Sequence, residues 1–318
     1  MNKFSIAVHG GAGTILKSNI TQEQEAAYLY ALDEALHTGY SLLEKGGTAL
    51  DAITAAVVSL ENCILFNAGR GSVFTKTGTH EMDAAIMNGA TMQAGAVAGV
   101  SKIKNPVELA LKIMQESEHV LLSGDGALLF AKEKGLQIEE DAYFFSQFRY
   151  DQWQQVKNEN LVALDHNISI SADAKAMADE KKFGTVGAVA CDMFGNLAAA
   201  TSTGGMTNKN YNRIGDTPII GAGTYANNNT CAISCTGHGE LFIKAVAAYD
   251  VSCLMEYKGL TLQQAMETVT LDKLVKINGE GGMIGVDANA NLAMIFNSEG
   301  MYRGMQSSNG QKEVAIYS

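Results

Sequence analysis

Thr185 has the side chain and the sequence position of a nucleophile that activates itself. It stands in the hexapeptide GTVGAV (184–189), at the start of an apolar run that predicts a buried strand. Gly184 leaves the backbone free to twist, so that the threonine hydroxyl could attack the carbonyl before it and cut the chain between Gly184 and Thr185. The cut would free an α-amino group with a pKa of about 8, which suits a general base at neutral pH. On the hexapeptide alone, a threonine in an ordinary strand is the better interpretation.

Three further residues could complete the chemistry at Thr185. Thr203 ends the segment 197–203, a predicted strand that pairs with the Thr185 strand, and its hydroxyl could bond the nucleophile. Thr236 and Gly237 lie in the turn SCTGHGE (234–240), where a hydroxyl and an N–H could form an oxyanion hole ahead of a helix. The alternatives stay open: Thr203 could bond only backbone, and the glycines of the turn could serve backbone geometry alone.

Arg213 and Asp216 offer a cation and an anion in the short loop RIGD (213–216). Such a pair could bind the α-carboxylate and the α-ammonium of an amino-acid substrate. A surface salt bridge is the ordinary alternative and, for this pair by itself, the better one.

Helices and short strands must position these residues. An apolar run at 4–8 predicts a buried strand that ends in a turn at HGGAG (9–13). Thr21 begins a capping box for a long helix that Gly46 and Gly47 would end, and Thr48 would cap a second helix. Further along, we expect short strands to about Val100, a helix from Asn105-Pro106, strands at 185–191, 197–203 and 230–235, two helices, and a hairpin around 287–291.

Residues 158–184 form the one segment whose composition predicts a linker, since Asn, Asp, Ala, Ser and Lys dominate it. Elsewhere, helices and strands come in blocks and do not alternate one for one. This order favours an α+β fold, with layered antiparallel sheets and helices outside them.

Composition excludes several classes of protein. The chain has 318 residues, of which 47% are hydrophobic, enough for one elaborate domain or two. A net charge of −11 argues against nucleic acid and anionic membranes as partners, and the apolar runs are too short to span a bilayer. The five cysteines form no CxxC pair, which indicates reduced thiols and no zinc site. Because the start also lacks the features of a secretory signal, we expect a cytoplasmic protein.

Seven sequence blocks, in order and at family spacing, make nearly the whole chain resemble one enzyme family. The blocks are HGGAG (9–13), FNAGRGSVF (66–74), AGAVAGV (94–100), GTVGAV (184–189), ATSTGGMTNK (200–209), RIGDTPIIGAG (213–223) and SCTGHGE (234–240). They resemble the plant-type asparaginase / isoaspartyl aminopeptidase family of N-terminal nucleophile (Ntn) hydrolases, the threonine-type β-aspartyl peptidases. Any one block is a weak signal, whereas the ordered set is specific.

The resemblance implies an enzyme that cuts itself and then hydrolyses β-aspartyl (isoaspartyl) dipeptides and the side-chain amide of L-asparagine. No cofactor would take part in the chemistry. The implied roles are nucleophile for Thr185, hydroxyl neighbours for Thr203 and Thr236, N–H donor for Gly237, contact to the nucleophile's amino group for Asn67, α-carboxylate and α-amine anchors for Arg213 and Asp216, and a carbonyl that helps to hold the amine for Gly239. This mechanism needs neither His9 nor His238, and we expect His9 to pack or hydrogen-bond beside the glycine loop.

The resemblance also implies a four-layer αββα sandwich of two mainly antiparallel sheets, with residues 1–318 as a single Ntn-hydrolase domain. The cut would leave an α subunit (1–184) and a β subunit (185–318) that stay together, and two such pairs would form an (αβ)2 heterotetramer. A structural sodium ion is implied as well, held by the main-chain carbonyls of Leu60, Glu61, Cys63, Phe66, Ala68 and Arg70.

Three other functions compete with this one. A glycosylasparaginase-like amidase would cleave the same β-amide bond with a sugar attached, but its secreted or lysosomal setting fits poorly with unpaired cysteines. A small-molecule kinase could use HGGAG (9–13) as a phosphate cradle, although the lysine of GxxxxGK[ST] is missing. A non-catalytic binding module would have no need for the complete set of Thr185, Thr203, Thr236, Arg213 and Asp216.

Overall fold

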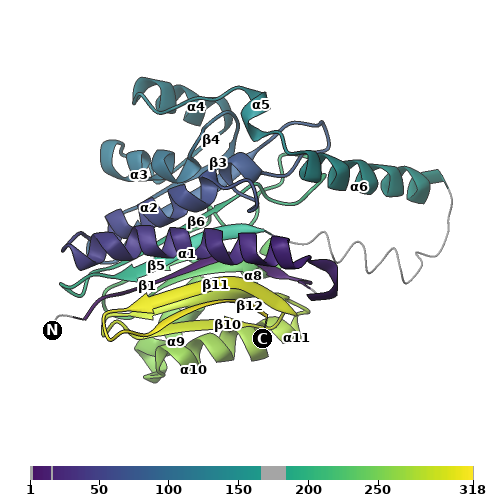
Figure 1. Ribbon diagram of the computed structural model, residues 1–318. Coiled ribbons are helices and arrows are strands. Elements are labelled where there is room, and N and C mark those ends of the chain that lie inside the picture. Colours follow the sequence, from purple (N-terminus) through teal and green to yellow (C-terminus); the bar gives the residue numbers. More distant parts are fainter. Residues whose placement is uncertain (1–2, 16, 166–183, 318) are drawn as a thin grey trace.

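A computed structural model describes residues 3–15, 17–165 and 184–317, and its strands form two stacked sheets with helices on both outer faces (Figure 1). Neighbouring strands in both sheets run antiparallel except where β3 (Ala94–Val100) pairs with β4 (Leu121–Ser123). The α+β fold and the four-layer αββα arrangement predicted from the sequence are thereby confirmed.

The larger sheet carries the strand that begins at Thr185. Its order is β12-β11-β1-β5-β6-β2-β3-β4. The remaining bounds are β1 (Ser5–Gly13), β2 (Met82–Asn88), β5 (Thr185–Cys191), β6 (Leu197–Thr203), β11 (Gly300–Ser307) and β12 (Lys312–Tyr317). β5 and β6 begin and end where the sequence predicted, and both are buried along their whole length. Small residues, mostly Ala, Gly, Val and Thr, allow layers to pack closely on both faces of these two strands.

The smaller sheet has the order β10-β9-β8-β7 and lies against β1, β5 and β6 of the larger sheet. Its strands are β7 (Thr224–Ala226), β8 (Cys231–Gly237), β9 (Gly281–Asp287) and β10 (Leu292–Phe296). Apolar side chains from both sheets, such as Val189, Ile233 and Met283, fill the space between them. The core therefore includes the layer that lies directly behind the Thr185 strand.

Helices cover the outer face of each sheet, as Figure 1 shows. The larger sheet is covered by α1 (Gln22–Glu44), α2 (Ala49–Asn62), α3 (Pro106–Glu116) and α4 (Gly124–Glu133), and the smaller one by α8 (Gly239–Ala245), α9 (Ala247–Lys258), α10 (Leu262–Glu267), a π-helical turn (Thr268–Lys273) and α11 (Leu274–Lys276). The remaining elements are three short ones, η1 (Lys17–Asn19), η2 (Gly69–Gly71) and α5 (Asp141–Phe144), and the long helix α6 (Gln147–Asp165). The predicted capping box at Thr21 and the cap at Thr48 are confirmed by hydrogen bonds to the first turns of α1 and α2.

Two predicted segments differ from the structure. The turn expected at 9–13 is wrong, because β1 continues to Gly13 and pairs with β11 through a bulge between His9 and Gly11. Glycine is required in this stretch, since a Cβ on Gly10 would overlap the ring of Phe66. The second difference is that α6 extends to Asp165, into the segment 158–184 that was expected to be a linker; residues 166–183 lie outside the described part of the chain.

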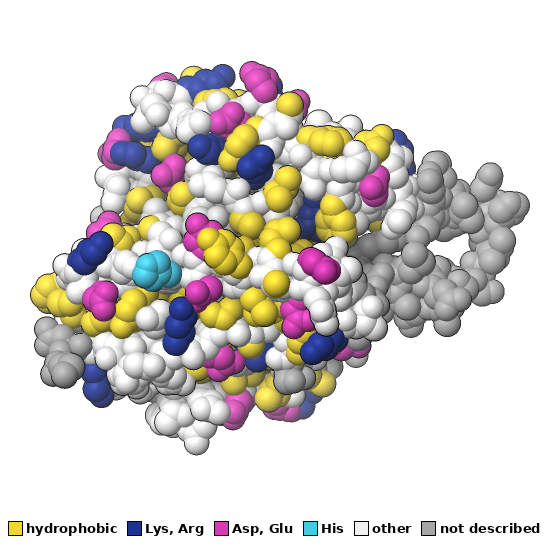
Figure 2. Space-filling view, viewed as in Figure 1, with side chains coloured by type: hydrophobic (Ala, Val, Ile, Leu, Met, Phe, Trp, Pro, Cys, Tyr) yellow, Lys and Arg dark blue, Asp and Glu magenta, His cyan; other side chains and the backbone are white. Residues whose placement is uncertain are grey.

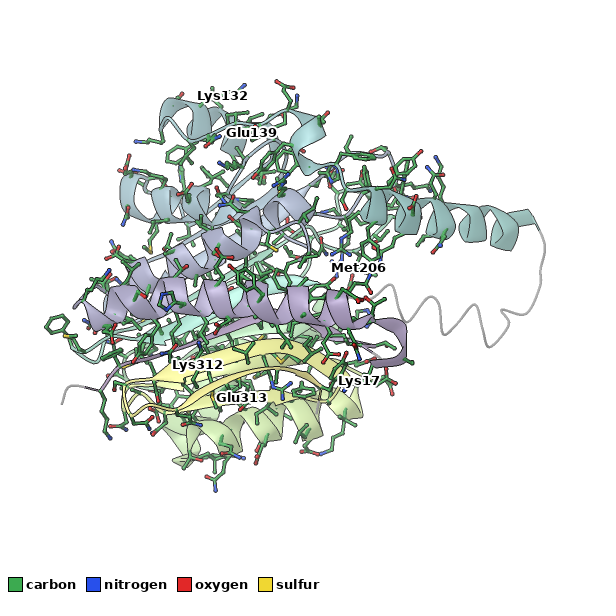
Figure 3. The ribbon with its side chains drawn as sticks, viewed as in Figure 1. Lys17, Lys132, Glu139, Met206, Lys312 and Glu313 are labelled. Atoms are coloured by element: carbon green, nitrogen blue, oxygen red, sulfur yellow. The ribbon has the colours of Figure 1, made fainter. Side chains whose placement is uncertain are left out.

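The surface seen in Figure 2 carries basic and acidic side chains interspersed. Some of these charges connect layers. Lys312 and Glu313 lie on β12 below α1 (Figure 3), and Lys312 forms an ion pair with Asp33 of α1. Within the described residues, no helix is both long enough and apolar enough to cross a membrane.

Candidate active site

Thr185 lies directly opposite Thr203 in the β5–β6 pairing, as predicted. The Thr185 hydroxyl donates to Thr203 Oγ1 at 3.2 Å, and the Thr203 hydroxyl lies 3.1 Å from the carbonyl oxygen of Gly184. Thr203 Oγ1 also accepts the N–H of Gly205 at 2.9 Å. The two threonines are buried, with 8% and 3% of their surfaces exposed. Thr203 thus contacts both the hydroxyl of Thr185 and the carbonyl oxygen of the peptide bond that precedes it.

Asn67 lies against Gly184, so a third predicted residue joins the group. A Cβ on Gly184 would come within 2.7 Å of the Asn67 Cβ, closer than two such atoms can approach. The Asn67 amide donates to the carbonyl of Gly205 at 2.7 Å and accepts the N–H of Val73 at 3.0 Å. Asn67 therefore fixes the loop in front of the Gly184–Thr185 bond.

Thr236 and Gly237 end β8, in the smaller sheet, where β8 packs across β5. The Thr236 hydroxyl accepts the N–H of Ala12 in β1 at 3.3 Å and is fully buried. Gly237 has a φ of 155°, and a Cβ there would overlap the carbonyl oxygen of Glu280. The contacts of Thr236 thus run to β1, and the oxyanion hole predicted from this pair stays a prediction.

Arg213, Asp216 and Gly239 come together at the start of α8. A Cβ on Gly239 would lie 2.9 Å from both the Arg213 guanidinium and Asp216 Oδ1, so glycine leaves room for the two charged groups. Asp216 is 4% exposed, and its Oδ2 has no hydrogen-bond partner among the described residues. Burial raises the pKa of Asp216 to about 7, although the nearby Arg213 lowers it. A buried carboxylate oxygen without a partner is suited to bind a cation that arrives with a ligand.

Glu240 is a site residue that the sequence analysis missed. Its carboxylate accepts two hydrogen bonds from Arg213, from Nε at 2.7 Å and from an Nη at 2.6 Å. Within the described residues Arg213 forms its ion pair with Glu240, and the salt bridge to Asp216 that was the alternative is not formed. The outer N–H groups of the guanidinium are of the kind that binds a carboxylate. The only signal in the sequence was the position of Glu240 at the end of the block SCTGHGE (234–240).

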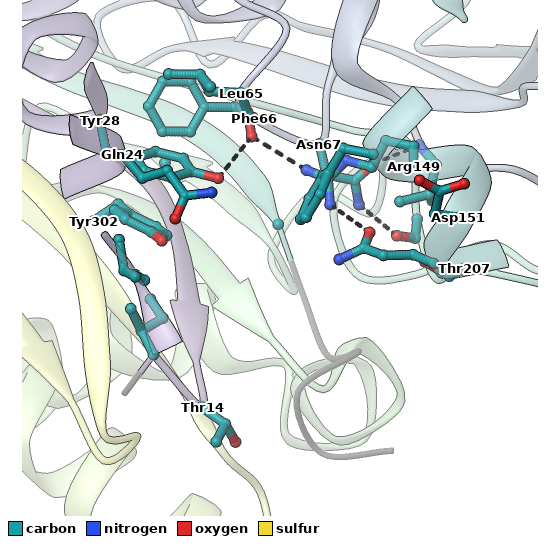
Figure 4. Close-up of a pocket in the computed structure, with 18 of the residues that line it drawn as sticks. Thr14, Gln24, Tyr28, Leu65, Phe66, Asn67, Arg149, Asp151, Thr207 and Tyr302 are labelled. Atoms are coloured by element: carbon teal, nitrogen blue, oxygen red, sulfur yellow. Dashed lines mark hydrogen bonds between the residues drawn. The ribbon is translucent and has the colours of Figure 1, made fainter. Parts of the chain in front are cut away.

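A cavity of about 400 Å³ opens beside the Gly184–Thr185 bond (Figure 4). Gly184, Asn67 and Gly205 line one part of it, and residues of α1, α6, β1 and β11 contribute to the remainder. Arg213 and Asp216 are not among the lining residues, so this cavity adjoins the Gly184–Thr185 bond and not the predicted substrate anchors.

Arg149 of α6 is a second missed residue. It is half-buried at the cavity wall, and its guanidinium donates to the carbonyls of Leu65 and Gly71 at 3.2 Å each. The carbonyls of Leu65, seen beside Arg149 in Figure 4, and of Gly71 flank Asn67 in one loop, so Arg149 fixes the shape of that loop. Nothing in the sequence around Arg149 indicated this role.

The loop expected to hold sodium forms several hydrogen bonds within its own backbone. The carbonyls of Leu60, Phe66 and Ala68 each accept one backbone N–H, which leaves each oxygen a second lone pair. The Glu61 side chain is used elsewhere, since it accepts from Val107 N and Ser202 Oγ. In the described residues, no group of three or more His, Cys, Asp and Glu side chains could hold a metal ion.

Comparison with known proteins gives consistent results. The family model described as "Asparaginase" matches residues 2–316. The chain is 52% identical to a Salmonella typhimurium protein named isoaspartyl peptidase, over 95% of both chains. It is 51% identical to the Escherichia coli protein of the same name, over 95% of this chain and 92% of the other. A plant-type L-asparaginase of Pyrococcus furiosus is 42% identical, over 93% of this chain and 94% of the other.

Proposed function

Because this chain belongs to the asparaginase family, we propose that it is a threonine Ntn hydrolase that cleaves β-aspartyl amides. One observation carries the proposal: the Thr185 hydroxyl bonds Thr203, whose own hydroxyl lies 3.1 Å from the carbonyl oxygen of Gly184. This geometry suits both a self-cut before Thr185 and a later attack by the same hydroxyl on a substrate.

Self-cleavage would begin with the attack of Thr185 Oγ1 on the carbonyl carbon of Gly184. A hydrogen bond from Thr203 would stabilise the negative charge that develops on the Gly184 oxygen. The acyl group then moves from nitrogen to oxygen, and hydrolysis of the ester gives chains 1–184 and 185–318. The Thr185 nitrogen, until then part of a peptide bond, becomes the amine that serves as general base.

Hydrolysis would follow on a substrate held by its own α-groups. We assign its α-carboxylate to Arg213, oriented by Glu240, and its α-ammonium to Asp216 with the help of the Gly239 carbonyl. The β-carbonyl would then face Thr185, with Thr236 and Gly237 proposed as donors to its oxygen. An acyl-enzyme would form, the amine would leave, and water activated by the Thr185 amine would release aspartate.

The proposed substrates are β-aspartyl (isoaspartyl) dipeptides and L-asparagine. The relatives named above support this choice, since their names include isoaspartyl peptidase and L-asparaginase. Neither the glycosylasparaginase-like alternative nor the kinase finds support among these relatives.

We also propose that the whole chain is one domain, that its cut halves stay together, and that two αβ pairs form an (αβ)2 assembly. The outer helices support the last point because they expose large apolar side chains, among them Tyr249, Tyr257, Val275 and Ile277. Five unpaired cysteines are in keeping with a cytoplasmic location.

The carbonyls of Leu60, Glu61, Cys63, Phe66, Ala68 and Arg70 are proposed to hold a structural sodium ion. Arg149 bonds two other carbonyls of the same loop, and the oxygens of Leu60, Phe66 and Ala68 each keep a second lone pair that an ion could use. Thermal unfolding in sodium against tetramethylammonium chloride at equal ionic strength tests this, and equal midpoints would rule the ion out.

The decisive experiment follows the mass of the purified chain and its release of aspartate. We expect the mass of denatured wild type to show two chains, one that ends at Gly184 and one that begins at Thr185, and the native protein to hydrolyse a panel of β-aspartyl dipeptides and asparagine. Thr185→Ala should stay one chain without activity. Thr230→Ala, which alters another buried threonine away from the site, is the matched control and should behave as wild type. An uncut Thr185→Ala enzyme with full activity would exclude the mechanism.

A further inference from the structure

His9 is a buried side chain that the proposed mechanism does not use. It lies in β1, fully buried, opposite Gly187 of β5. Its Nδ1 lies 2.9 Å from the carbonyl oxygen of Thr185, and its Nε2 lies 2.8 Å from Ser234 Oγ in β8. His9 thereby connects the proposed nucleophile to the other sheet.

The partners of His9 determine where its proton lies. A carbonyl oxygen can only accept, so Nδ1 must carry the hydrogen that bonds the Thr185 oxygen. Burial lowers the pKa of His9 to about 3, and the ring is therefore neutral at physiological pH. In a neutral ring Nε2 has no proton, so the hydroxyl of Ser234 must donate to it.

The same reasoning gives the next hydrogen bonds a single direction. Ser234 has used its only proton on His9, so the 2.7 Å contact between Ser234 and Thr201 must be donated by Thr201. Thr201 in turn accepts from Thr224 at 2.7 Å. All of these hydroxyls are fully buried. The result is a chain of donors that runs from Thr224 through Thr201, Ser234 and His9 to the carbonyl of Thr185.

The chain reaches the substrate side of the site. Thr224 Oγ1 also lies 3.1 Å from the carbonyl oxygen of Thr217, the residue after the proposed anchor Asp216. Thr201 Oγ1 lies 3.3 Å from the carbonyl oxygen of Gly223, which ends the same loop. The chain of hydrogen bonds therefore ends beside the anchor loop, with the protons of Thr224 and Thr201 donated inside the chain and not to these two carbonyls.

Gly187 leaves the room between the two sheets that this chain of hydrogen bonds needs. A Cβ on Gly187 would overlap both Ser234 Oγ and His9 Nε2. Gly187 occupies a central position of β5, where glycine lacks the packing and the propensity of a β-branched residue. The close approach of His9 and Ser234 accounts for a glycine at this position.

We propose that His9 and Ser234 are positioning residues, which hold the carbonyl of Thr185 and thereby aim its hydroxyl. The inference rests on the proposed role of Thr185 as nucleophile. Before a cut, the peptide bond to Gly184 also restrains Thr185. After the cut, Thr185 is a chain end. It is then held by the pairing of β5, by Thr203 at its hydroxyl and by His9 at its carbonyl. The orientation given by His9 then acts on every turnover.

Variants along the chain test the proposal. Ser234→Ala and Thr201→Val each remove one hydroxyl with little change of shape. His9→Phe removes both ring hydrogen bonds, while His9→Asn keeps an N–H donor on the Thr185 side. Ser252→Ala is the matched control, since Ser252 is fully buried and forms a 2.7 Å hydroxyl pair with Thr230 in another part of the fold.

The measurements are the rate of self-cleavage by intact mass, kcat and KM for one β-aspartyl dipeptide, and the unfolding midpoint. We expect Ser234→Ala and Thr201→Val to lower kcat about tenfold with KM within about twofold, as the loss of one orienting hydrogen bond predicts. Ser252→Ala should lower the unfolding midpoint about as much as Ser234→Ala does, and should leave kcat unchanged. His9→Asn should retain more of kcat than His9→Phe. The pH profile of kcat in His9→Asn should have the same shape as in wild type, because His9 titrates far below the working pH range.

Three results would overturn the proposal: Ser234→Ala with wild-type kcat and a loss of stability equal to that of Ser252→Ala, His9→Phe with wild-type rates, or a His9→Asn profile that has lost an ionisation. If His9→Phe does not fold, Ser234→Ala and Thr201→Val decide by the same criteria. A wild-type chain that neither cuts itself nor releases aspartate would instead refute the proposed function, so the two failures are distinguishable.

Discussion

The hydroxyls of Thr185 and Thr203 lie 3.2 Å apart on neighbouring strands, as a directly opposed pair of β5 and β6. The pair shares one face of the sheet, and the second hydroxyl points on to the carbonyl oxygen of Gly184. A change at Thr203 should therefore affect both the cut and the later hydrolysis.

Thr203→Val keeps the shape of the side chain and removes its hydroxyl. We expect self-cleavage to slow about tenfold or more, since the Gly184 oxygen loses a donor where charge develops. The fraction of cut chain against time, measured by intact mass, checks this. Thr203→Ser restores the hydroxyl and should recover most of the rate; equal rates for the Val and Ser variants would contradict the role assigned to Thr203.

Gly184→Ala should block or strongly slow the cut. The new Cβ would lie 2.7 Å from the Cβ of Asn67, and a short side chain fixed by two hydrogen bonds cannot move aside easily. Gly126→Ala is the control, because a Cβ at Gly126 meets open space in α4. Both variants are compared by the time course of cleavage after purification, and a Gly184→Ala chain that matures as fast as wild type would show that the contact with Asn67 is unimportant.

Asp216 should make substrate binding depend on pH. Its pKa is raised to about 7, so below that pH the carboxyl is neutral and cannot pair with a substrate ammonium. We expect kcat/KM for asparagine to fall as pH decreases through about 7, with Asp216→Asn removing this part of the profile and raising KM. Succinamate, which is asparagine without its α-amino group, provides the control. A profile for succinamate identical to that for asparagine would assign the ionisation to another group.

Glu240→Gln should weaken substrate binding through Arg213. The carboxylate of Glu240 restricts the orientation of the Arg213 guanidinium by accepting two hydrogen bonds from it. A glutamine side chain would offer only one acceptor oxygen and no charge. Because Glu240 is 41% exposed, we expect only a moderate rise in KM, about fivefold, with kcat nearly unchanged. Glu313→Gln alters the carboxylate beside Arg303 and serves as the matched control. An unchanged KM in Glu240→Gln would mean that Arg213 needs no such partner.

Glu61 should make stability depend on pH. Burial raises its pKa from 4.5 to about 8, although Ser202, Val107 and Asn105 donate hydrogen bonds to it. A raised pKa means that the folded chain holds the proton more tightly, so the contribution to stability is complete below about 4.5 and is lost as pH rises through about 8. Unfolding midpoints from pH 5 to pH 9 should fall less in Glu61→Gln than in wild type. Glu133→Gln, at an exposed position of α4, should follow the wild-type curve; parallel curves for all three proteins would remove Glu61 as the cause.

Much of the fold was predictable because its signals are local. The capping threonines Thr21 and Thr48 began helices as expected, and the strands at 185–191 and 197–203 matched their apolar runs. The stretch 9–13 was mistaken for a turn because glycines signal both turns and close approaches, and only the packing of Gly10 on Phe66 distinguishes them.

The site was only partly predictable, because its remaining interactions join distant parts of the chain. The pairing of Arg213 with Glu240 depends on where α8 begins, and the contact of His9 with Ser234 depends on the stacking of two sheets. Residue types and spacing indicated which groups could do chemistry. They did not indicate which carboxylate would orient the arginine and which would be left without a partner.

The order of strands in the larger sheet places β5, which follows the proposed cut, between β1, which precedes it, and β6. β6 pairs in turn with β2, again from before the cut. The two pieces of a cut chain would therefore be interleaved, and neither could leave without unfolding the other. A new amino terminus at Thr185 would arise only in chains whose distant segments had already assembled around Gly184. Enzymatic competence would thus wait for completed folding, and misfolded copies of the chain would stay inactive.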